Sequence, residues 1–499
     1  MTAPPKAPTS DFKATDLWLF GAVLAVLTYW LFAQTLLVAK TTIAQDLGLR
    51  DTTANLAVSI TALFAGLFIV LMGSLADRVG RARLLQLGLV LSVVGCLFIA
   101  LTPAHSGSLT SGMMMTGRII QGLSTAAIMP AVLALINTFY EGAARQRAVS
   151  FFSIGTFGGS ALTAIVGGLV VDQLGWRAIF WVSIGAAVVS FLLTVNTPNV
   201  KAETDPAKGH PRFDWGGMIT FMIAMLAFNV YISQGKTIGW LSLWGIGLIM
   251  LTVVFGALFL FIERRRIGSH PFVDLTLFSI PRFFGPTLAN FLVNTGVAVI
   301  LVTLTLAQLG AGFNPFQASL LTLGYMIAIF CVIRVGERLL RRFGPKKPML
   351  WGLAIVLVGT MLNSLTFLPQ TPYLVAAVVG FTCFGTGLGF FATPATDAAI
   401  SAAPKAQAGA ASGIFKMGSS LGSAIGIAIA AALMVAGQSV PAETVSSWAL
   451  FSSGWTAEAA PFRFGTMLGN GFIVIMMAVS LIATMVTVPS ETNAGRDKH

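Results

Sequence analysis

The sequence predicts an all-α polytopic membrane protein with fourteen transmembrane helices in two related halves. Charged residues make up 10% of its 499 residues, against about 25% in soluble domains, and its mean hydropathy is +0.85. Lipid offers an unpaired backbone no hydrogen-bond partner, so segments that cross it are helical or form closed barrels. Fourteen apolar stretches have roughly the 20 residues that a helix needs to span a bilayer. They lie near 17–39, 54–72, 84–102, 112–137, 148–171, 178–196, 215–234, 241–262, 284–309, 315–334, 349–368, 373–400, 408–436 and 465–488.

The distribution of Lys and Arg predicts which ends of these helices face the cytoplasm. If the N-terminus lies inside, 22 of the 30 basic residues fall in inner loops or tails and 4 in outer loops. Cytoplasmic loops carry such an excess, so we expect both termini in the cytoplasm and an even number of spans. Residues 1–16 are polar and contain no small-residue cleavage site, so no removable signal peptide is expected.

Internal similarity at a shift of about 264 residues predicts two halves of six spans each. Residues 78–83 (RVGRAR) then fall on 342–347 (RFGPKK), and 128–131 (IMPA) fall on 392–395 (ATPA). Parallel repeats of this kind are related by an axis along the membrane normal, as in one large class of transporters. We expect an N-terminal six-helix bundle at 1–196, a cytoplasmic linker at 197–212, two inserted helices at 213–263 and a C-terminal six-helix bundle and tail at 264–499.

Glycines recur along one span of each half at intervals that are multiples of four. This spacing gives a helix a smooth ridge that a second helix can approach closely. Static packing and a sliding surface are equally good interpretations of such a ridge. The predicted packing residues are Gly155, Gly159 and Gly167 in the first half and Gly418, Gly422 and Gly426 in the second.

The loop at 73–83 (GSLADRVGRAR) lies between the second and third predicted spans. It resembles the G-x-L-A-D-R-x-G-R-x-R signature that the major facilitator superfamily carries at this place. Glycine permits a tight turn in the loop, and the basic cluster holds the loop on the inside. The resemblance implies that the loop latches the two halves in the outward-open state through Gly73, Asp77, Arg78, Gly80 and Arg81.

Residues 118–122 (RIIQG) resemble the R-x-x-Q-G motif of proton-coupled members of this superfamily. An arginine inside a span costs about 3 kcal/mol on insertion scales, so Arg118 is expected to face a cavity or a partner. The resemblance gives Arg118 a part in proton coupling, and a structural arginine near the outer surface is the alternative. In the fifth span, Gly167 and Gly168 keep the end of the G-P-x-x-G-G motif of drug antiporters, but Thr163 and Ala164 replace its Gly and Pro.

Other segments resemble the fourteen-span drug:proton antiporters of the staphylococcal Nor type, which are quinolone efflux pumps. These segments are 28–34 (TYWLFAQ), 153–160 (SIGTFGGS), 334–337 (RVGE), 346–350 (KKPML), 392–397 (ATPATD) and 413–417 (GIFKM). The resemblance covers nearly the whole chain and implies a multidrug exporter driven by proton entry.

Four charged residues of the second half are expected near one depth, at the cytoplasmic ends of their spans. They are Arg334, Glu337, Asp397 and Lys416. Pairing lowers the cost of holding charges in a membrane. In one interpretation, Asp397 or Glu337 carries the proton that drives transport. In the other, which we favour because the residues lie far from the midplane, the four form a salt-bridge gate that seals the cytoplasmic end.

Aromatic, methionine and amide side chains on several spans predict a substrate cavity. Aromatic and Met side chains suit varied apolar ligands and amides can orient them, although each residue has helix packing as its alternative. Because Arg118 and Lys416 supply positive charge and no acid clearly lies at mid-membrane, we expect neutral, zwitterionic or carboxylate-bearing substrates rather than dications. The predicted lining is Tyr29, Trp30, Gln34, Gln121, Met129, Asn290, Phe291, Asn294, Phe390 and Phe391.

The sequence therefore favours a proton-coupled exporter that works by alternating access in the inner membrane of a bacterium. A proton-coupled uptake symporter for an organic anion shares the fold and is the alternative. We expect no enzyme activity, no cofactor beyond the proton motive force and no metal, because Cys96, Cys331 and Cys383 are isolated and the histidines lack ligand spacing. The expected partners are protons, small-molecule substrates and the lipid bilayer, without nucleic acid, and the expected state is a monomer.

Overall fold

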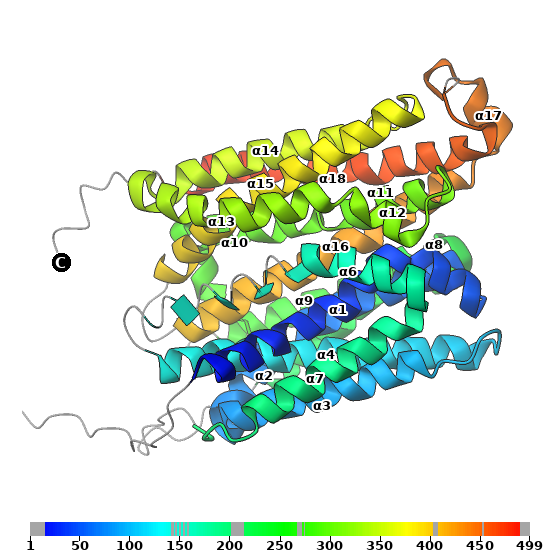
Figure 1. Ribbon diagram of the computed structural model, residues 1–499. Helices are drawn as coiled ribbons and strands as arrows, with labels where there is room; N and C mark the ends of the chain where they lie inside the picture. The colour runs from blue at the N-terminus through cyan, green and yellow to red at the C-terminus, as the bar shows by residue number, and fades with distance from the viewer. Residues whose placement is uncertain are drawn as a thin grey trace, which may run out of the picture.

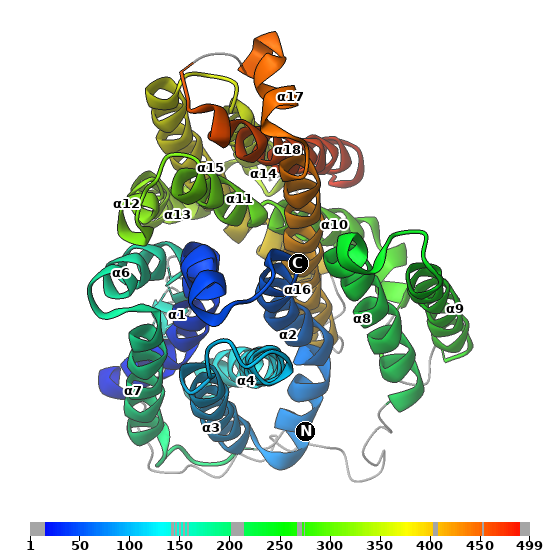
Figure 2. The same cartoon turned by 90° about the vertical axis from the view of Figure 1, so that its right-hand side faces the viewer.

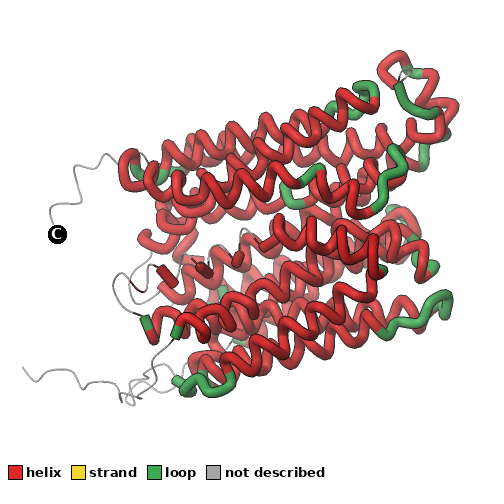
Figure 3. The backbone as a smooth tube through the Cα atoms, viewed as in Figure 1, coloured by secondary structure: helices red, strands yellow, loops and turns green. Residues whose placement is uncertain are grey.

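The computed structural model describes residues 15–489 except 141–143, 145–146, 149–150, 153–154, 157–158, 201–213, 267–271, 274, 403–407 and 452–453. Within these residues every regular element is helical (Figure 1, Figure 3). The first helices are α1 (Asp16–Leu47), α2 (Asp51–Val79), α3 (Arg81–Ala100), α4 (Ser108–Phe139), α6 (Gly159–Leu174) and α7 (Trp176–Thr194). They are followed by α8 (Trp215–Ile238) and α9 (Leu243–Arg265). The remaining helices are α10 (Pro281–Thr295), α11 (Ala298–Leu309), α12 (Pro315–Leu320), α13 (Leu323–Phe343), α14 (Lys346–Ser364), α15 (Gln370–Ala402), α16 (Ala408–Gln438), α17 (Ala442–Ser447) and α18 (Ala460–Thr487), with short 3-10 turns at Leu275–Ser279, Ala449–Phe451 and Ala457–Ala459.

The long helices run side by side, so the molecule has two ends (Figure 1). Helix α1 begins at one end, where α18 also finishes, and α17 lies at the opposite end. We refer to these as the terminal end and the α17 end.

The helices form two bundles with a helix pair attached at one side (Figure 2). Helices α1, α2, α3, α4, α6 and α7 make the first bundle, and α11, α13, α14, α15 and α18 are grouped in the second. The bundles meet where α2 packs against α16, where α1 packs against α11 and α12, and where α6 packs against α12. The pair α8–α9 contacts the rest mainly through α8, which packs against both α2 and α16.

Twelve helical segments of the described chain are long and apolar enough to cross a membrane. The helical membrane fold is thus confirmed, whereas the predicted count of fourteen spans is not. The two further predicted spans coincide with α6, whose apolar part is the shorter Ile165–Leu174, and with α14, whose 19 residues begin with two lysines. Since α6 packs on α1 and α14 on α15 and α18, both run among the spanning helices, and fourteen remains a prediction.

The glycine ridges lie at equivalent helix contacts in the two halves. A Cβ on Gly159 would lie 2.6 Å from the indole of Trp30 in α1, and a Cβ on Gly422 would collide with the Phe291 carbonyl in α10. Close backbone approach at small residues is how helices pack where lipid supplies no hydrophobic drive. Gly155 also faces α1, Gly418 and Gly426 also face α10, and Gly167 is buried within α6.

Two prolines repeat the same feature in the two halves. Pro130 lies inside α4 and Pro394 inside α15, 264 residues later. A proline inside a helix removes one backbone hydrogen bond and clashes with the carbonyl four residues earlier, which kinks the helix. The shift found in the sequence therefore relates α4 to α15, as the glycine ridges relate α1 and α6 to α10 and α16.

Candidate transport site

Arg118 and Arg463 are the largest fully buried side chains of the described residues, each with 1% of its surface exposed, and Arg118 lies in the first bundle. The Nε of Arg118 donates to the carbonyl of Ala57 in α2 at 2.8 Å, and its Nη1 donates to the carbonyl of Phe32 in α1 at 3.1 Å. Nη1 also donates to Oε1 of Gln121, one turn later in α4, at 2.8 Å. The guanidinium thus joins three helices of the first bundle.

The partners of Arg118 within the described chain are neutral oxygens rather than carboxylates. Arg stays protonated in proteins under almost all conditions, so this bundle holds a buried positive charge without a neutralising acid beside it. Neutral acceptors satisfy the donors but leave the charge to act on whatever enters the site. Gln121, fully buried, is fixed by Arg118 and by its Nε2, which donates to Sγ of Cys96 at 3.3 Å.

Aromatic side chains of α1 lie close to this charge. The ring of Tyr29 packs edge-on against Trp30 at 4.8 Å and against Phe32 at 5.7 Å between centroids, and it lies within electrostatic reach of Arg118. The indole Nε1 of Trp30 is buried and has no hydrogen-bond partner among the described residues. A buried Trp N–H normally finds a partner, so this donor is available to a bound molecule.

The amides predicted on α10 hold the second bundle together. Nδ2 of Asn290 donates to the carbonyl of Phe415 at 3.0 Å and to Oγ of Ser419 at 2.6 Å, both in α16. Nδ2 of Asn294 donates to the carbonyl of Asn290 at 2.7 Å. Phe291, between them, presents its backbone to the glycine ridge of α16. These residues therefore line the α10–α16 contact, and only Phe291 and Asn294 are partly exposed.

Of the other predicted lining residues, one is buried in the apolar core and two are partly exposed. Phe391 is 2% exposed and belongs to the apolar core. Phe390 is partly exposed and lies over Gly352 of α14, and Met129 is partly buried against the core of the first bundle. The side chain of Gln34 lies outside the described part of the chain.

The four charged residues of the second bundle differ in exposure. Glu337 is partly exposed and pairs with Arg341, one turn later in α13. Arg334, on the same helix, is exposed. Asp397 of α15 and Lys416 of α16 are both partly buried. Arg334 is thus the most exposed of the four, and the four residues come from three helices, α13, α15 and α16.

The loop of the superfamily signature is held within the first bundle. Gly80 links α2 and α3 with a φ of +115°, a conformation that glycine adopts without a Cβ clash. Asn199, beyond α7, covers this turn and donates from Nδ2 to the carbonyl of Val79 at 3.0 Å. Nη1 of Arg81 donates to Oγ1 of Thr138 in α4 at 2.6 Å. Gly73 lies in α2 near Pro130, and the side chains of Asp77 and Arg78 lie outside the described part.

Contacts at the α17 end join the two bundles, and the sequence analysis did not anticipate them. Thr41 of α1 donates to Oε1 of Gln308 in α11. Gly168 of α6 allows close approach of Ser319 in α12, whose Cβ lies 2.9 Å from the position of a Cβ on that glycine. Nothing in the local pattern of either helix signals such pairs, since they connect residues more than 150 positions apart.

A surface cluster near the same end fixes the start of α7. Oδ2 of Asp46 accepts from the indole Nε1 of Trp176 at 2.9 Å and from Nη1 of Arg177 at 2.7 Å. The Trp176 hydrogen bond, and after it the Arg177 hydrogen bond, hold the pKa of the Asp46 carboxyl below its usual value. Both donors are the first residues of α7.

Comparison with known proteins agrees with this architecture. The family model described as Major Facilitator Superfamily matches residues 19–427. The quinolone resistance protein NorB of Staphylococcus aureus is 40% identical over 415 residues, which cover 83% of this chain and 87% of NorB. Among solved structures, an auto-inhibited POT family peptide transporter gives a TM-score of 0.64 at 14% identity and covers 97% of this chain and 99% of its own. A bacterial homolog of the human lysosomal transporter Spinster gives 0.62 at 16% identity, covering 96% and 98%. The chain is therefore a multi-pass membrane transporter that belongs to the Major Facilitator Superfamily.

Proposed function

We propose that this protein is a proton-coupled efflux pump for amphipathic compounds of the quinolone type. The 40% identity to the quinolone resistance protein NorB, over 83% of the chain, is the observation that carries the proposal. No comparison favours the alternative of an organic-anion uptake symporter. We propose that the protein transports its substrate chemically unchanged.

The buried charge of Arg118 supports a role in proton-coupled binding. It lies within electrostatic reach of Tyr29, and it donates to the backbone carbonyl of Phe32 and to the amide oxygen of Gln121, which are neutral partners. Such a site favours an aromatic compound that is neutral, zwitterionic or carboxylate-bearing, and it disfavours a dication. We propose the proton motive force as the energy source, with no cofactor.

The charged residues of α13, α15 and α16 are better suited to a gate than to carrying the proton. Glu337 is partly exposed and already paired with Arg341, so a proton on it would be weakly linked to a buried site. Efflux by Asp397→Asn, measured with the protein verified in the membrane, tests the remaining acid. Full coupling in this variant would support the gate, and loss of coupling would place Asp397 in the proton path.

The arrangement in the membrane follows from the distribution of basic residues. We propose that the terminal end faces the cytoplasm of a bacterium and the α17 end faces outward, with the protein acting as a monomer in the cytoplasmic membrane. On this orientation Thr41, Gln308 and the Gly168–Ser319 contact close the outer end.

Everted membrane vesicles test both the direction and the cargo of transport. Vesicles with an acidified interior and the wild-type protein should accumulate a quinolone and a neutral dye above vesicles that lack the protein. An organic acid should not accumulate preferentially. Failure of these vesicles to accumulate the quinolone and the dye, together with accumulation of the organic acid in right-side-out vesicles, would contradict export and favour the uptake symporter.

A further inference from the structure

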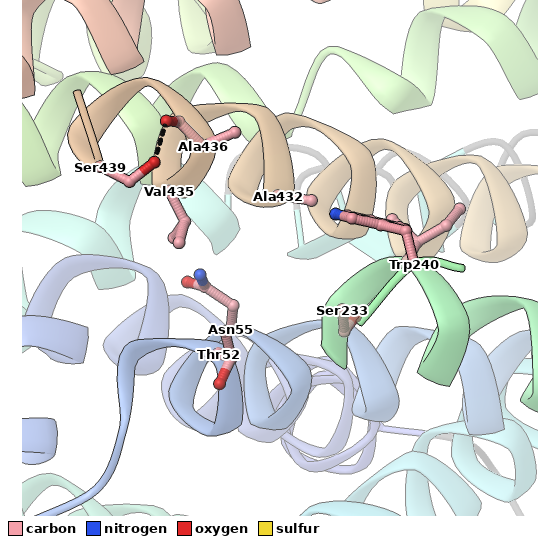
Figure 4. Close-up of a pocket in the computed structure, with 9 residues that line it drawn as sticks. Thr52, Asn55, Ser233, Trp240, Ala432, Val435, Ala436 and Ser439 are labelled. Carbon is pink, nitrogen blue, oxygen red and sulfur yellow. Dashed lines mark hydrogen bonds between the residues drawn. The ribbon is translucent and has the colours of Figure 1, made fainter. Parts of the chain in front are cut away.

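A cavity of about 160 Å³ lies at the α17 end, between α2, α8 and α16 (Figure 4). One wall is polar, with Thr52, Asn55 and Ser233, and the other is the apolar face of α16 around Ala432 and Val435. The cavity touches the first bundle, the second bundle and the inserted helix pair at once. It is separate from the site around Arg118, none of whose residues lines it.

One buried polar group that lines this cavity, and a second one turn away on α8, lack partners among the described residues. Ser233 is 6% exposed and Asn229, one turn earlier in α8, is 2% exposed. Within the described chain, neither Oγ of Ser233 nor Nδ2 of Asn229 has a hydrogen-bond partner. An unpaired buried polar group costs about 1–3 kcal/mol, so a molecule that supplies an acceptor to these groups recovers that free energy.

The remaining polar groups bias the cavity toward an acceptor with negative charge. Asn55 is 2% exposed, and its Oδ1 already accepts from Nζ of Lys40 at 3.3 Å. Its amide points across the cavity toward α16 (Figure 4), which leaves its NH₂ as the group to meet a ligand. The hydroxyl of Thr52 is shared with Thr237 at 3.0 Å. The free groups are therefore mainly donors.

Lys40 supplies positive charge behind these donors. Its side chain is 3% exposed, while its partner Asp51, 3.8 Å away, is 53% exposed and largely solvated. A solvated carboxylate offsets a buried ammonium only partly. Lys40 thus adds a positive charge behind Asn55 that Asp51 offsets only in part.

The size and the aromatic wall favour a single ring. An apolar cavity of about 150 Å³ is enough to hold benzene, whereas drug-sized ligands occupy roughly 300–1,000 Å³. The indole of Trp240 borders the cavity and is held in place by Gly235 and by edge-on packing on Tyr231 at 5.2 Å. Its face offers stacking to a planar ligand.

We propose that this cavity is a second binding site, for a single-ring aromatic carboxylate that enters from the α17 end. The ring lies between Trp240 and the apolar face of α16, and the carboxylate accepts from Ser233 and Asn55. Because the ligand contacts α2 and α16 together, it stabilises the spacing of the two bundles seen in this structure. A ligand that binds one state preferentially shifts the population toward it. As far as transport is concerned, the inference rests on the proposed efflux function: an aromatic carboxylate on the outer side should slow efflux.

Calorimetric titration of the full-length protein in nanodiscs with benzoate tests the site directly. Ser233→Ala removes an unpaired donor and should weaken benzoate binding about tenfold, the effect of losing one hydrogen bond to a charged group. Ser439→Ala is the matched control, because Ser439 also lines the cavity but donates to the carbonyl of Ala436 at 2.6 Å. Its affinity should equal that of the wild type. Ala436→Phe fills the cavity and should abolish binding.

The neutral analogue benzyl alcohol, which keeps the ring and loses the carboxylate, should bind about tenfold more weakly than benzoate. Absence of benzoate binding to the wild type would overturn the inference, as would equal affinities for the two ligands. Equal losses in Ser233→Ala and Ser439→Ala would also overturn it, since the donor would then not be recognised.

Quinolone accumulation in everted vesicles separates this inference from the proposed function. Benzoate loaded inside the vesicles, on the side of the α17 end, should lower the rate of accumulation by the wild type and leave Ala436→Phe unaffected. Pumping without benzoate binding would refute the second site and leave the efflux function standing. Benzoate binding with the expected variant pattern, but without pumping of any drug, would refute the efflux function and leave the site standing.

Discussion

Replacement of Arg118 by lysine keeps the buried positive charge but removes the guanidinium, whose two separate nitrogens donate to three acceptors. The guanidinium uses Nε and Nη1 to serve the carbonyls of Ala57 and Phe32 and the amide oxygen of Gln121, at 2.8, 3.1 and 2.8 Å. A single ammonium on a shorter stem cannot occupy both donor positions. At least one buried acceptor is then left unpaired, at about 1–3 kcal/mol each.

Arg118→Lys should therefore lower the free energy of unfolding by about 2–4 kcal/mol, from one or two lost acceptor contacts. Quinolone efflux should fall by about tenfold or more if the misplaced charge raises the transport barrier by about 1.4 kcal/mol. Thermal unfolding of the purified protein measures the first effect, and initial accumulation rates in everted vesicles measure the second, normalised to the amount of protein.

The matched control is Arg264→Lys, at an exposed position in the last turn of α9. This change should leave both stability and transport at wild-type values, because an exposed side chain has water to replace its hydrogen bonds. If Arg118→Lys behaved like Arg264→Lys in both assays, the three-helix hydrogen-bond arrangement would have no part in stability or transport, and the reasoning from it would be refuted.

Two further changes test the packing and the surface. Gly422→Ala places a Cβ against the Phe291 carbonyl and should destabilise the protein by about 1–3 kcal/mol through overpacking. The control Gly471→Ala, with nothing within 4 Å of its Cβ, should leave the unfolding temperature unchanged. Equal effects of the two changes would contradict close packing of α10 on the glycine ridge of α16. Asp46→Asn should cost less than about 1 kcal/mol at neutral pH, because the carboxylate is 45% exposed and exposed pairs are weak. Since the Trp176 and Arg177 hydrogen bonds depress the pKa of Asp46, its contribution is present above the unfolded value of about 3.9 and is lost as the pH falls through the lower folded value. The stability difference between wild type and Asp46→Asn should thus vanish on acidification below about pH 4, and a difference that grew in acid would contradict the assignment.

The fold was predictable because its determinants are local or repeated in the sequence. The length of each apolar stretch predicts a membrane-spanning helix. The internal similarity at a shift of about 264 residues relates Pro130 in α4 to Pro394 in α15. The signature at 73–83 identified the superfamily, and Gly80 does form the turn between α2 and α3. The number of spans was harder to predict from the sequence. The apolar part of α6 is shorter than that of its neighbours, and α14 begins with two lysines.

The site was predictable only in part, because a span shows which residues are polar or aromatic and not which neighbour they meet. Asn290 was expected to orient a ligand, yet it donates to α16. Phe391 was expected to line a cavity, yet it is 2% exposed. The contact of Lys40 with Asn55 depends on how α1 packs on α2. The environment of Ser233, whose Oγ has no partner within the described chain, depends on the placement of the inserted pair against α2. No periodicity in these segments encodes either arrangement.

The glycine ridges constrain the glycine positions more tightly than the residues that the glycines contact. The spacing between α10 and α16 is determined where Gly422 meets the main chain of Phe291, so it depends on an absent side chain and on backbone atoms that every residue has in common. A substitution of Phe291 keeps the backbone atoms that set this spacing, whereas a substitution of Gly422 changes it. A pump built in this way can exchange a side chain such as Phe390, which lies outside this contact, while the distance between α10 and α16 stays the same.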